Sequence, residues 1–141
     1  ALACAVASST RARTVCGSTP RKPAVLSLIW ETHNKLWFAG VNANWKLAAF
    51  EIHEIQETLE QITKFQQERE ESRMTGSLLP RLDSIQLAVS EGKVDRFREQ
   101  YALLTDACND CHRATDFGFN VVKIPDEPPF TNQEFKLKDG Q

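Results

Sequence analysis

Residues 108–112, Cys-Asn-Asp-Cys-His, have the side chains and the spacing that attach a c-type haem. Each thiol can add to one vinyl group of the porphyrin, which forms two thioether bonds, and the histidine after the second thiol can reach the iron. Because positions three apart lie on nearly the same side of a helix, Cys108 and Cys111 can hold one edge of the ring. We therefore predict one covalent haem c per chain, with His112 as the proximal iron ligand.

Three alternatives compete for the same residues. A zinc site could use Cys108, Cys111 and His112, but it needs a fourth ligand, and the sequence has no second Cys-x-x-Cys or His-x3-His pair. A redox dithiol of the thioredoxin type needs a βαβ context. The third alternative is a pair of buried cysteines near a helix end. The alternative function is therefore a haem-free helical interaction module whose cysteine pair forms a disulfide or a metal site.

Three residues are candidates for the opposite side of the iron. His33 lies on the apolar stripe of a predicted helix and points inward, so it is the first candidate for the distal ligand. His53 borders a stripe beside acidic residues and is expected at the surface, and Met74 lies in a charged connector. Two strong axial ligands favour one-electron transfer, whereas His112 alone leaves room for NO or CO.

The elements that must position these residues are helices, because apolar residues recur at steps of three and four. The first helix runs from Ala24 until Gly40 interrupts it. The second begins near Asn42 or Asn44, either of which can cap a helix, and ends near Phe65. A third, shorter helix follows the polar connector QQEREESRMTGS and closes at SEGK. The apolar stripes of these helices are Leu26, Ile29, Trp30, His33, Leu36 and Trp37; Trp45, Ala48, Ile52, Ile55, Leu59 and Ile62; and Leu78, Leu82, Ile85 and Val89.

The fourth predicted helix carries both cysteines. Its stripe, with spacings of 3, 4, 3, 4 and 3, consists of Val94, Phe97, Tyr101, Leu104, Cys108 and Cys111. Because the cysteines continue this stripe, a group bound to them is expected against the core. We predict an all-α fold, an antiparallel four-helix bundle with an extended Pro-rich C-terminal tail.

The two ends of the chain differ from this helical domain. Residues 1–23 are rich in Ser, Thr and Arg and are predicted to be a flexible tail or the remnant of a secretory leader. Residues 24–141 form the predicted haem domain, and the prolines at its end exclude a long helix there. Cys4 and Cys16 could pair in an exported protein or belong to the leader. The acidic residues Glu51, Glu54, Glu57 and Glu60 are interpreted as a solvated helix face.

Composition excludes other classes. The 17 basic and 19 acidic side chains give a net charge of −2, which does not favour nucleic-acid binding. No apolar run reaches the roughly 18 residues of a spanning helix, so no membrane span is predicted. No paired acid and base share a face, which favours an electron carrier over a catalyst. A homodimer is compatible with the sequence.

A four-helix bundle with the attachment motif near the end of its last helix resembles the cytochrome c prime family. The blocks HNKLWFAGVNANWKLAAFEIHEI, CNDCHRATDFGFNVV and PPFTNQEF are similar to those of small bacterial haem proteins, over about residues 25–135. The resemblance implies covalent haem c, export to the periplasm, and electron transfer to a redox partner protein or binding of a small gas. The chain departs from the family in the 141 − 112 = 29 residues that follow His112, which could cover the haem edge.

Further residues could contact the porphyrin. Haem propionates are anionic and favour cationic donors where they are buried. The cations near the predicted haem region, each also interpretable as an ordinary solvated side chain, are Lys35, Arg81, Arg113 and Lys123. The aromatic residues that could pack on the ring, or simply fill the core, are Trp30, Trp37, Trp45, Tyr101, Phe117 and Phe119.

Overall fold

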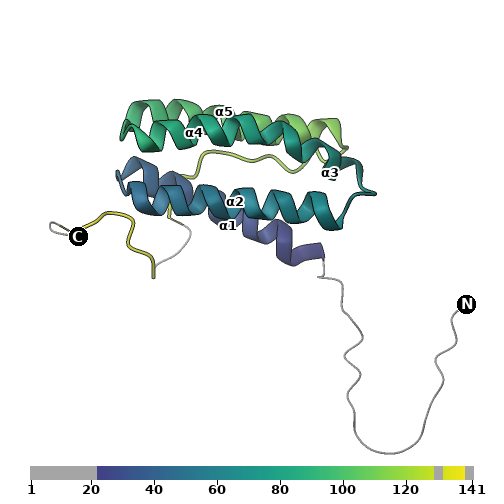
Figure 1. The fold of residues 1–141 in the computed structure, drawn as a ribbon, viewed down its shortest axis with the longest axis horizontal. Helices are drawn as coiled ribbons and strands as arrows, with labels where there is room; N and C mark the ends of the chain where they lie inside the picture. The colour runs from purple at the N-terminus through teal and green to yellow at the C-terminus, as the bar shows by residue number, and fades with distance from the viewer. Residues whose placement is uncertain (1–21, 129–131, 139–141) are drawn as a thin grey trace, which may run out of the picture.

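The structure is a computed structural model that describes residues 22–128 and 132–138, with side chains from residue 28 onward. Its elements, shown in Figure 1, are α1 (Lys22–Val41), α2 (Trp45–Phe65), α3 (Glu70–Met74), the 3-10 helix η1 (Thr75–Leu78), α4 (Leu79–Ser90) and α5 (Val94–Ala114). None of the described residues lies in a strand, so the predicted all-α class is confirmed for them. The predictions for residues 1–21, including Cys4 and Cys16, lie outside this range.

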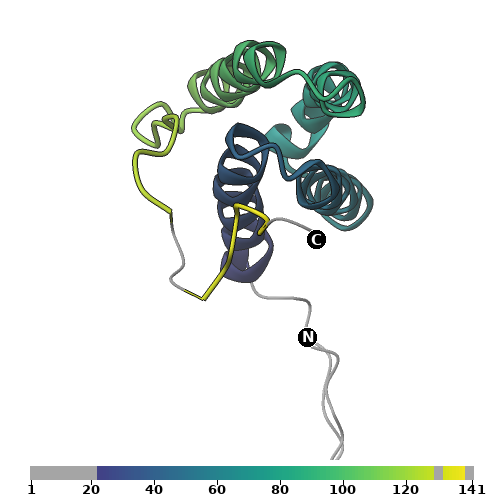
Figure 2. The same ribbon diagram turned by 90° about the vertical axis from the view of Figure 1, so that its left-hand side faces the viewer.

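The four long helices form two pairs joined by short loops. Residues 42–44 connect α1 to α2, and residues 91–93 connect α4 to α5. The helix α1 contacts α2 and α5, and α4 contacts the same two helices. Figure 2 views the helices nearly end-on, with α1 and α2 below and α4 and α5 above. Each long helix therefore turns one face toward a shared interior.

Both short loops have the local chemistry that ends and restarts a helix. The Asn44 side chain accepts a hydrogen bond from the Leu47 backbone N–H at 3.3 Å, which confirms one of the two predicted caps. Gly92 has a φ of +66°, a conformation that glycine adopts without a steric penalty. Beyond it, the Lys93 backbone N–H donates to the Ala88 carbonyl at 3.3 Å.

The boundaries differ from the predicted ones in two places. The first helix begins at Lys22 instead of Ala24 and continues through Gly40 to Val41. Gly40 lies within the helix against the Phe97 ring, and a Cβ atom at this position would overlap that ring. The predicted polar connector is also partly helical, since α3 and η1 occupy it.

Most of the predicted stripes are buried. The largest enclosed side chains include Tyr101, Phe97, Leu36, Ile52, Leu82 and Ile85. Near the α1–α2 and α4–α5 loops, four rings form an aromatic cluster of Trp37, Trp45, Phe97 and Tyr101, with centroid distances of 4.9 to 6.3 Å. Such rings supply much of the burial energy in a small domain.

The prediction that the acidic residues of α2 form a solvated face is wrong for one residue, Glu51. Glu51 is only 2% exposed, whereas Glu57 and Glu60 are exposed. Its carboxyl lies three positions after buried Ala48 and therefore on the core-facing side of the helix. Burial raises the pKa of Glu51 to about 7, and Lys35 opposes part of this rise.

Beyond α5 the described residues form turns, bends and irregular backbone. In Figure 2 this segment runs along the side of the molecule past α5 and α1. The Asn109 side chain fixes it by donating to the Val122 carbonyl at 2.9 Å and accepting from the Val122 N–H at 2.8 Å. Farther along, Phe135 is buried and packs on Phe38 with a centroid distance of 5.5 Å.

Candidate functional site

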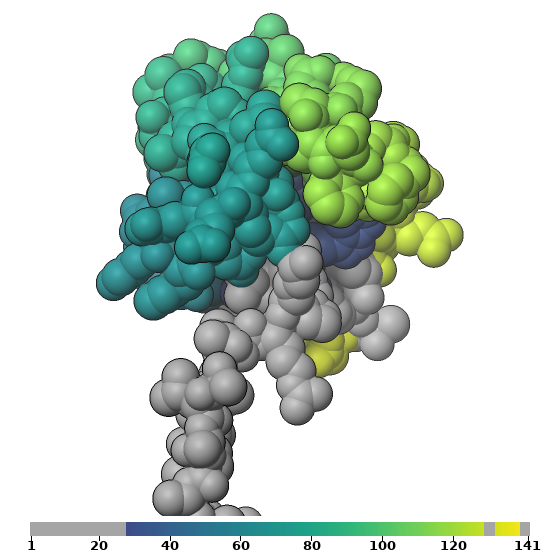
Figure 3. Space-filling view, turned by 90° about the vertical axis from the view of Figure 1, so that its right-hand side faces the viewer, coloured from purple at the N-terminus to yellow at the C-terminus, as the bar shows by residue number. Residues whose placement is uncertain are grey.

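A cavity of about 230 Å³ lies among the helices at the end that holds α3. Its walls come from α1, α2, the residues between α2 and α4, α4, α5 and the segment after α5. In Figure 3 the residues between α2 and α4 (teal) and the end of α5 (light green) face each other there, with α1 (purple) visible between them. The apolar part of the wall consists of Ile29, Trp30, Ile55, Leu59, Ile62, Leu78, Leu82, Leu104, Phe117 and Val122.

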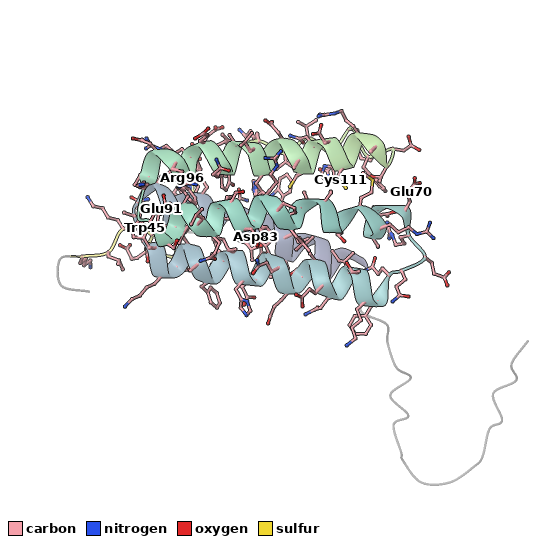
Figure 4. All side chains as sticks on the ribbon, turned by 45° about the horizontal axis from the view of Figure 1, so that its top comes forward. Trp45, Glu70, Asp83, Glu91, Arg96 and Cys111 are labelled. Atoms are coloured by element: carbon pink, nitrogen blue, oxygen red, sulfur yellow. The ribbon has the colours of Figure 1, made fainter. Side chains whose placement is uncertain are left out.

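Cys108, Cys111 and His112 all line this cavity. They lie in the last turns of α5, and Figure 4 shows Cys111 at the same end of the molecule as Glu70 of α3. Both cysteines are free thiols and half-buried. Burial, with Cys111 nearby, raises the pKa of Cys108 to about 11, and burial also raises the pKa of Cys111. A reactive dithiol needs a lowered pKa, so these environments disfavour the redox alternative.

The His112 ring is oriented by the segment after α5. Its Nδ1 lies 2.5 Å from the Asn120 carbonyl oxygen, which can only accept a hydrogen bond, so Nδ1 carries the proton. In the neutral ring this tautomer leaves a lone pair on Nε2. Histidines that bind metals commonly donate their other ring N–H to a carbonyl in this way.

His33 reaches the cavity from α1 and is 6% exposed, as its place on the stripe predicted. Its Nδ1 lies 2.9 Å from the Tyr101 hydroxyl, which is also 2.9 Å from the His33 carbonyl. On the other side of the ring, Nε2 lies 3.3 Å from Thr105 Oγ1. Burial lowers the pKa of His33 to about 4, so the ring is neutral at pH 7.

Two proton arrangements satisfy the His33 contacts. In the first, the Tyr101 hydroxyl donates to Nδ1 and Nε2–H donates to Thr105. In the second, Nδ1–H donates to Tyr101, whose hydroxyl donates to the His33 carbonyl. The second arrangement leaves a lone pair on Nε2, and only this tautomer can bind a metal ion through Nε2. The contact that must be given up is the longer one, from Nε2 to Thr105.

The other candidates for the iron lie elsewhere. His53 is exposed and pairs with Glu57 at 3.3 Å, as expected for a surface histidine. Met74 belongs to α3 and is not among the residues found on the cavity wall.

The four suggested propionate partners are likewise absent from the described wall. Arg113 pairs with Asp110 and Lys123 with Asp126. Among the suggested aromatic residues, Trp30 and Phe117 line the cavity, while Trp37, Trp45 and Tyr101 belong to the aromatic cluster. Phe119 is 82% exposed.

Sequence reasoning missed the polar wall residues that lie within residues 66–75. Arg69 is the only lysine or arginine among the described wall residues, and it forms an ion pair with Glu71. Ser72 Oγ is buried without a hydrogen-bond partner in the described part of the chain. The sequence carried no signal for either, because a polar stretch between two helices is ordinarily a solvated loop.

The cavity wall is mostly apolar, so it suits an apolar group that carries a few polar substituents. Two thiols and an imidazole with a free Nε2 on one wall fit a covalently attached porphyrin. In the described residues no three His, Cys, Asp or Glu side chains are placed to hold a metal ion, which gives the zinc alternative no support.

Comparisons with protein-family models, curated proteins and solved structures found no match. Among the described helices, none combines the length and the hydrophobicity needed to span a membrane.

Proposed function

We propose that this chain is a c-type haem protein similar to the cytochrome c prime family. In this proposal the helices form an antiparallel four-helix bundle with an extended Pro-rich C-terminal tail. Cys108 and Cys111 attach one haem c, and His112 binds the iron. The observation that carries the proposal is a single cavity that is bordered by both thiols and by an imidazole whose Nδ1 is bound to the Asn120 carbonyl.

The residues have complementary roles. Cys108 and Cys111 would hold the group through two thioethers, each formed by addition of S–H across one vinyl group, which requires no oxidant. His112 would supply Nε2 to the iron, and its bond to Asn120 fixes the ring and increases its basicity. The bound haem supplies a reversible Fe(III)/Fe(II) couple. The apolar wall limits the access of water, which is one of the levers that set a haem potential.

We assign the distal position to His33, which makes one-electron transfer the favoured function. His33 and His112 border the same cavity from α1 and α5. The Tyr101 contact at 2.9 Å can hold the His33 tautomer with a free Nε2. Two firm ligands leave no open coordination position, so the protein acts as an electron carrier for a redox partner. Because haem c is attached outside the cytoplasm in similar systems, the expected location is the periplasm.

The first test is covalent attachment. The full chain is expressed in a bacterial host with cytochrome c assembly, and its intact mass and pyridine haemochrome spectrum are measured. The expected result is the mass of one haem per chain, and its loss in Cys108→Ala/Cys111→Ala. Protein that matures in this host with only the polypeptide mass contradicts the proposal. It would instead favour the haem-free interaction module.

A second candidate function, binding of NO or CO, is favoured by the contact from His33 Nε2 to Thr105. If His33 keeps that bond, the iron has one protein ligand. Ferrous spectra with and without CO distinguish the two functions. No shift in wild type and a shift in His33→Ala support electron transfer. A shift of the same size in both proteins supports gas binding.

A further inference from the structure

Five polar residues of the cavity wall lie on one short stretch between α2 and α4. These are Gln66, Arg69, Glu71, Ser72 and Thr75. Thr75 is already satisfied, since its hydroxyl bonds to the Ser72 carbonyl at 2.7 Å and to the Thr63 hydroxyl at 2.9 Å. The other four residues border a cavity whose remaining wall is largely apolar, so this stretch is the place where a polar part of a bound group can be accommodated.

Ser72 is the unusual member of this stretch. Ser72 is 2% exposed, and its hydroxyl has no hydrogen-bond partner in the described part of the chain. A buried hydroxyl without a hydrogen bond costs about 1–3 kcal/mol. An acceptor oxygen on a bound group would satisfy it.

Arg69 supplies the charge. A guanidinium has five N–H donors, and a single carboxylate takes at most two of them, so the pair with Glu71 leaves donors for a second anion. The Glu71 carboxylate also lies on the wall and opposes a second anion. Arg69 and Ser72 together therefore favour the binding of an anionic group at this place, and the Glu71 carboxylate weakens that binding.

The stretch lies on a different part of the chain from the cysteines. Gln66 caps α2, and Arg69 precedes α3. Both α3 and η1 contact α5, and in Figure 3 this stretch (teal) faces the end of α5 (light green). The propionates of haem c leave the porphyrin at the edge opposite the two vinyl groups, so groups that bind them are expected on an element other than the one that carries the thioethers.

We infer that Arg69, with Ser72 as a second donor, binds the propionates of the attached haem. This inference rests on the proposed haem function. It replaces Lys35, Arg81, Arg113 and Lys123 as the propionate partners.

The test is the midpoint potential of the haem-loaded protein as a function of pH. In Arg69→Leu, removal of a nearby positive charge lowers the ratio of reduced to oxidised protein at a fixed potential by about tenfold, which corresponds to a fall of about 59 mV. The propionate pKa also rises, so the pH-dependent part of the potential moves to higher pH. Ser72→Ala is expected to lower the ratio twofold to threefold, and Glu71→Gln to raise it.

The matched control is Arg73→Leu. Arg73 is exposed, lies on α3 and carries the same charge, but it is not on the described cavity wall. Its substitution is expected to change the ratio less than twofold. Equal effects of Arg69→Leu and Arg73→Leu overturn the inference while the haem function stands.

If Arg69→Leu does not accumulate with haem, Arg69→Lys replaces it. Lysine keeps the charge and loses the planar donor set, so an intermediate shift is expected and an unchanged pH profile overturns the inference. Wild type without attached haem overturns the proposed function itself, so the two failures are distinguishable.

Discussion

The interior of the helical domain is packed differently at its two ends. Near the short loops, the interior is filled by the aromatic cluster. Figure 4 shows Trp45 at that end and Cys111 at the other. At the second end α3 and η1 precede the shorter α4, and the wall residues, which include Ile29, Leu59 and Cys108, border a cavity. One end of the helical domain is therefore filled by aromatic rings, and the other encloses a space.

The largest effect is expected at the filled end. Phe97→Ala removes a ring that is fully buried and touches three other aromatic rings, so we expect a loss of about 4 kcal/mol in the free energy of unfolding. Urea unfolding measures this change. The matched variant at the cavity is Leu59→Ala, which should cost about 2 kcal/mol because its side chain has fewer neighbours on the cavity side. Equal losses would contradict the difference between the two ends.

Gly40→Ala tests how closely α1 approaches α5 at the filled end. The added methyl group would overlap the Phe97 ring, so we expect a loss of about 2–3 kcal/mol despite the higher helix propensity of alanine. Gly76→Ala is the control, because nothing lies within 4 Å of a Cβ atom there. In a Phe97→Leu background the cost of Gly40→Ala should fall, and an unchanged cost would exclude Phe97 as its cause.

Tyr101 belongs to both ends, since its ring packs on Phe97 and its hydroxyl contacts His33. Tyr101→Phe leaves the His33 Nδ1 without its partner in a buried site, which should cost about 2 kcal/mol in urea unfolding. In haem-loaded protein the same change should permit CO binding, because the His33 tautomer is no longer held. Loss of stability with an unchanged CO response would limit Tyr101 to a packing role.

A substitution at Glu51 tests how a buried carboxyl group away from the cavity affects stability. Its folded pKa, raised to about 7, lies above the unfolded value, so the folded state binds the extra proton. Stability is then greatest at low pH and falls as the pH rises from about 4.5 to above 7. Glu51→Gln removes this dependence and should gain roughly 3 kcal/mol at pH 8 and almost nothing at pH 4. Glu60→Gln on the exposed face should change neither, and a gain there would implicate general charge repulsion.

Spacing predicted the elements that carry long apolar stripes. The limits of α2 and the start of α5 agree with it, because apolar residues such as Ile52, Leu59, Phe97 and Tyr101 recur regularly without an interrupting proline. Spacing did not predict the burial of polar residues. Glu51 and Thr58 occupy buried positions of α2 although neither is apolar.

The candidate site was predictable only in part. Cys108, Cys111, His112 and His33 were recognised from a motif and a stripe, which are local signals. Arg69 and Ser72 border the same cavity because of how α3 and η1 pack. No local sequence pattern around these two residues predicts that position.

The bond from His112 to Asn120 spans only eight positions in the chain. Together with the Asn109 contacts to Val122, it makes residues 108–122 a largely self-supporting unit, whereas His33 must arrive from the far end of the sequence. If the proposed haem function holds, the residues that attach the cofactor would be oriented by contacts local in the chain, whereas its second ligand would be supplied only when α1 packs against α5.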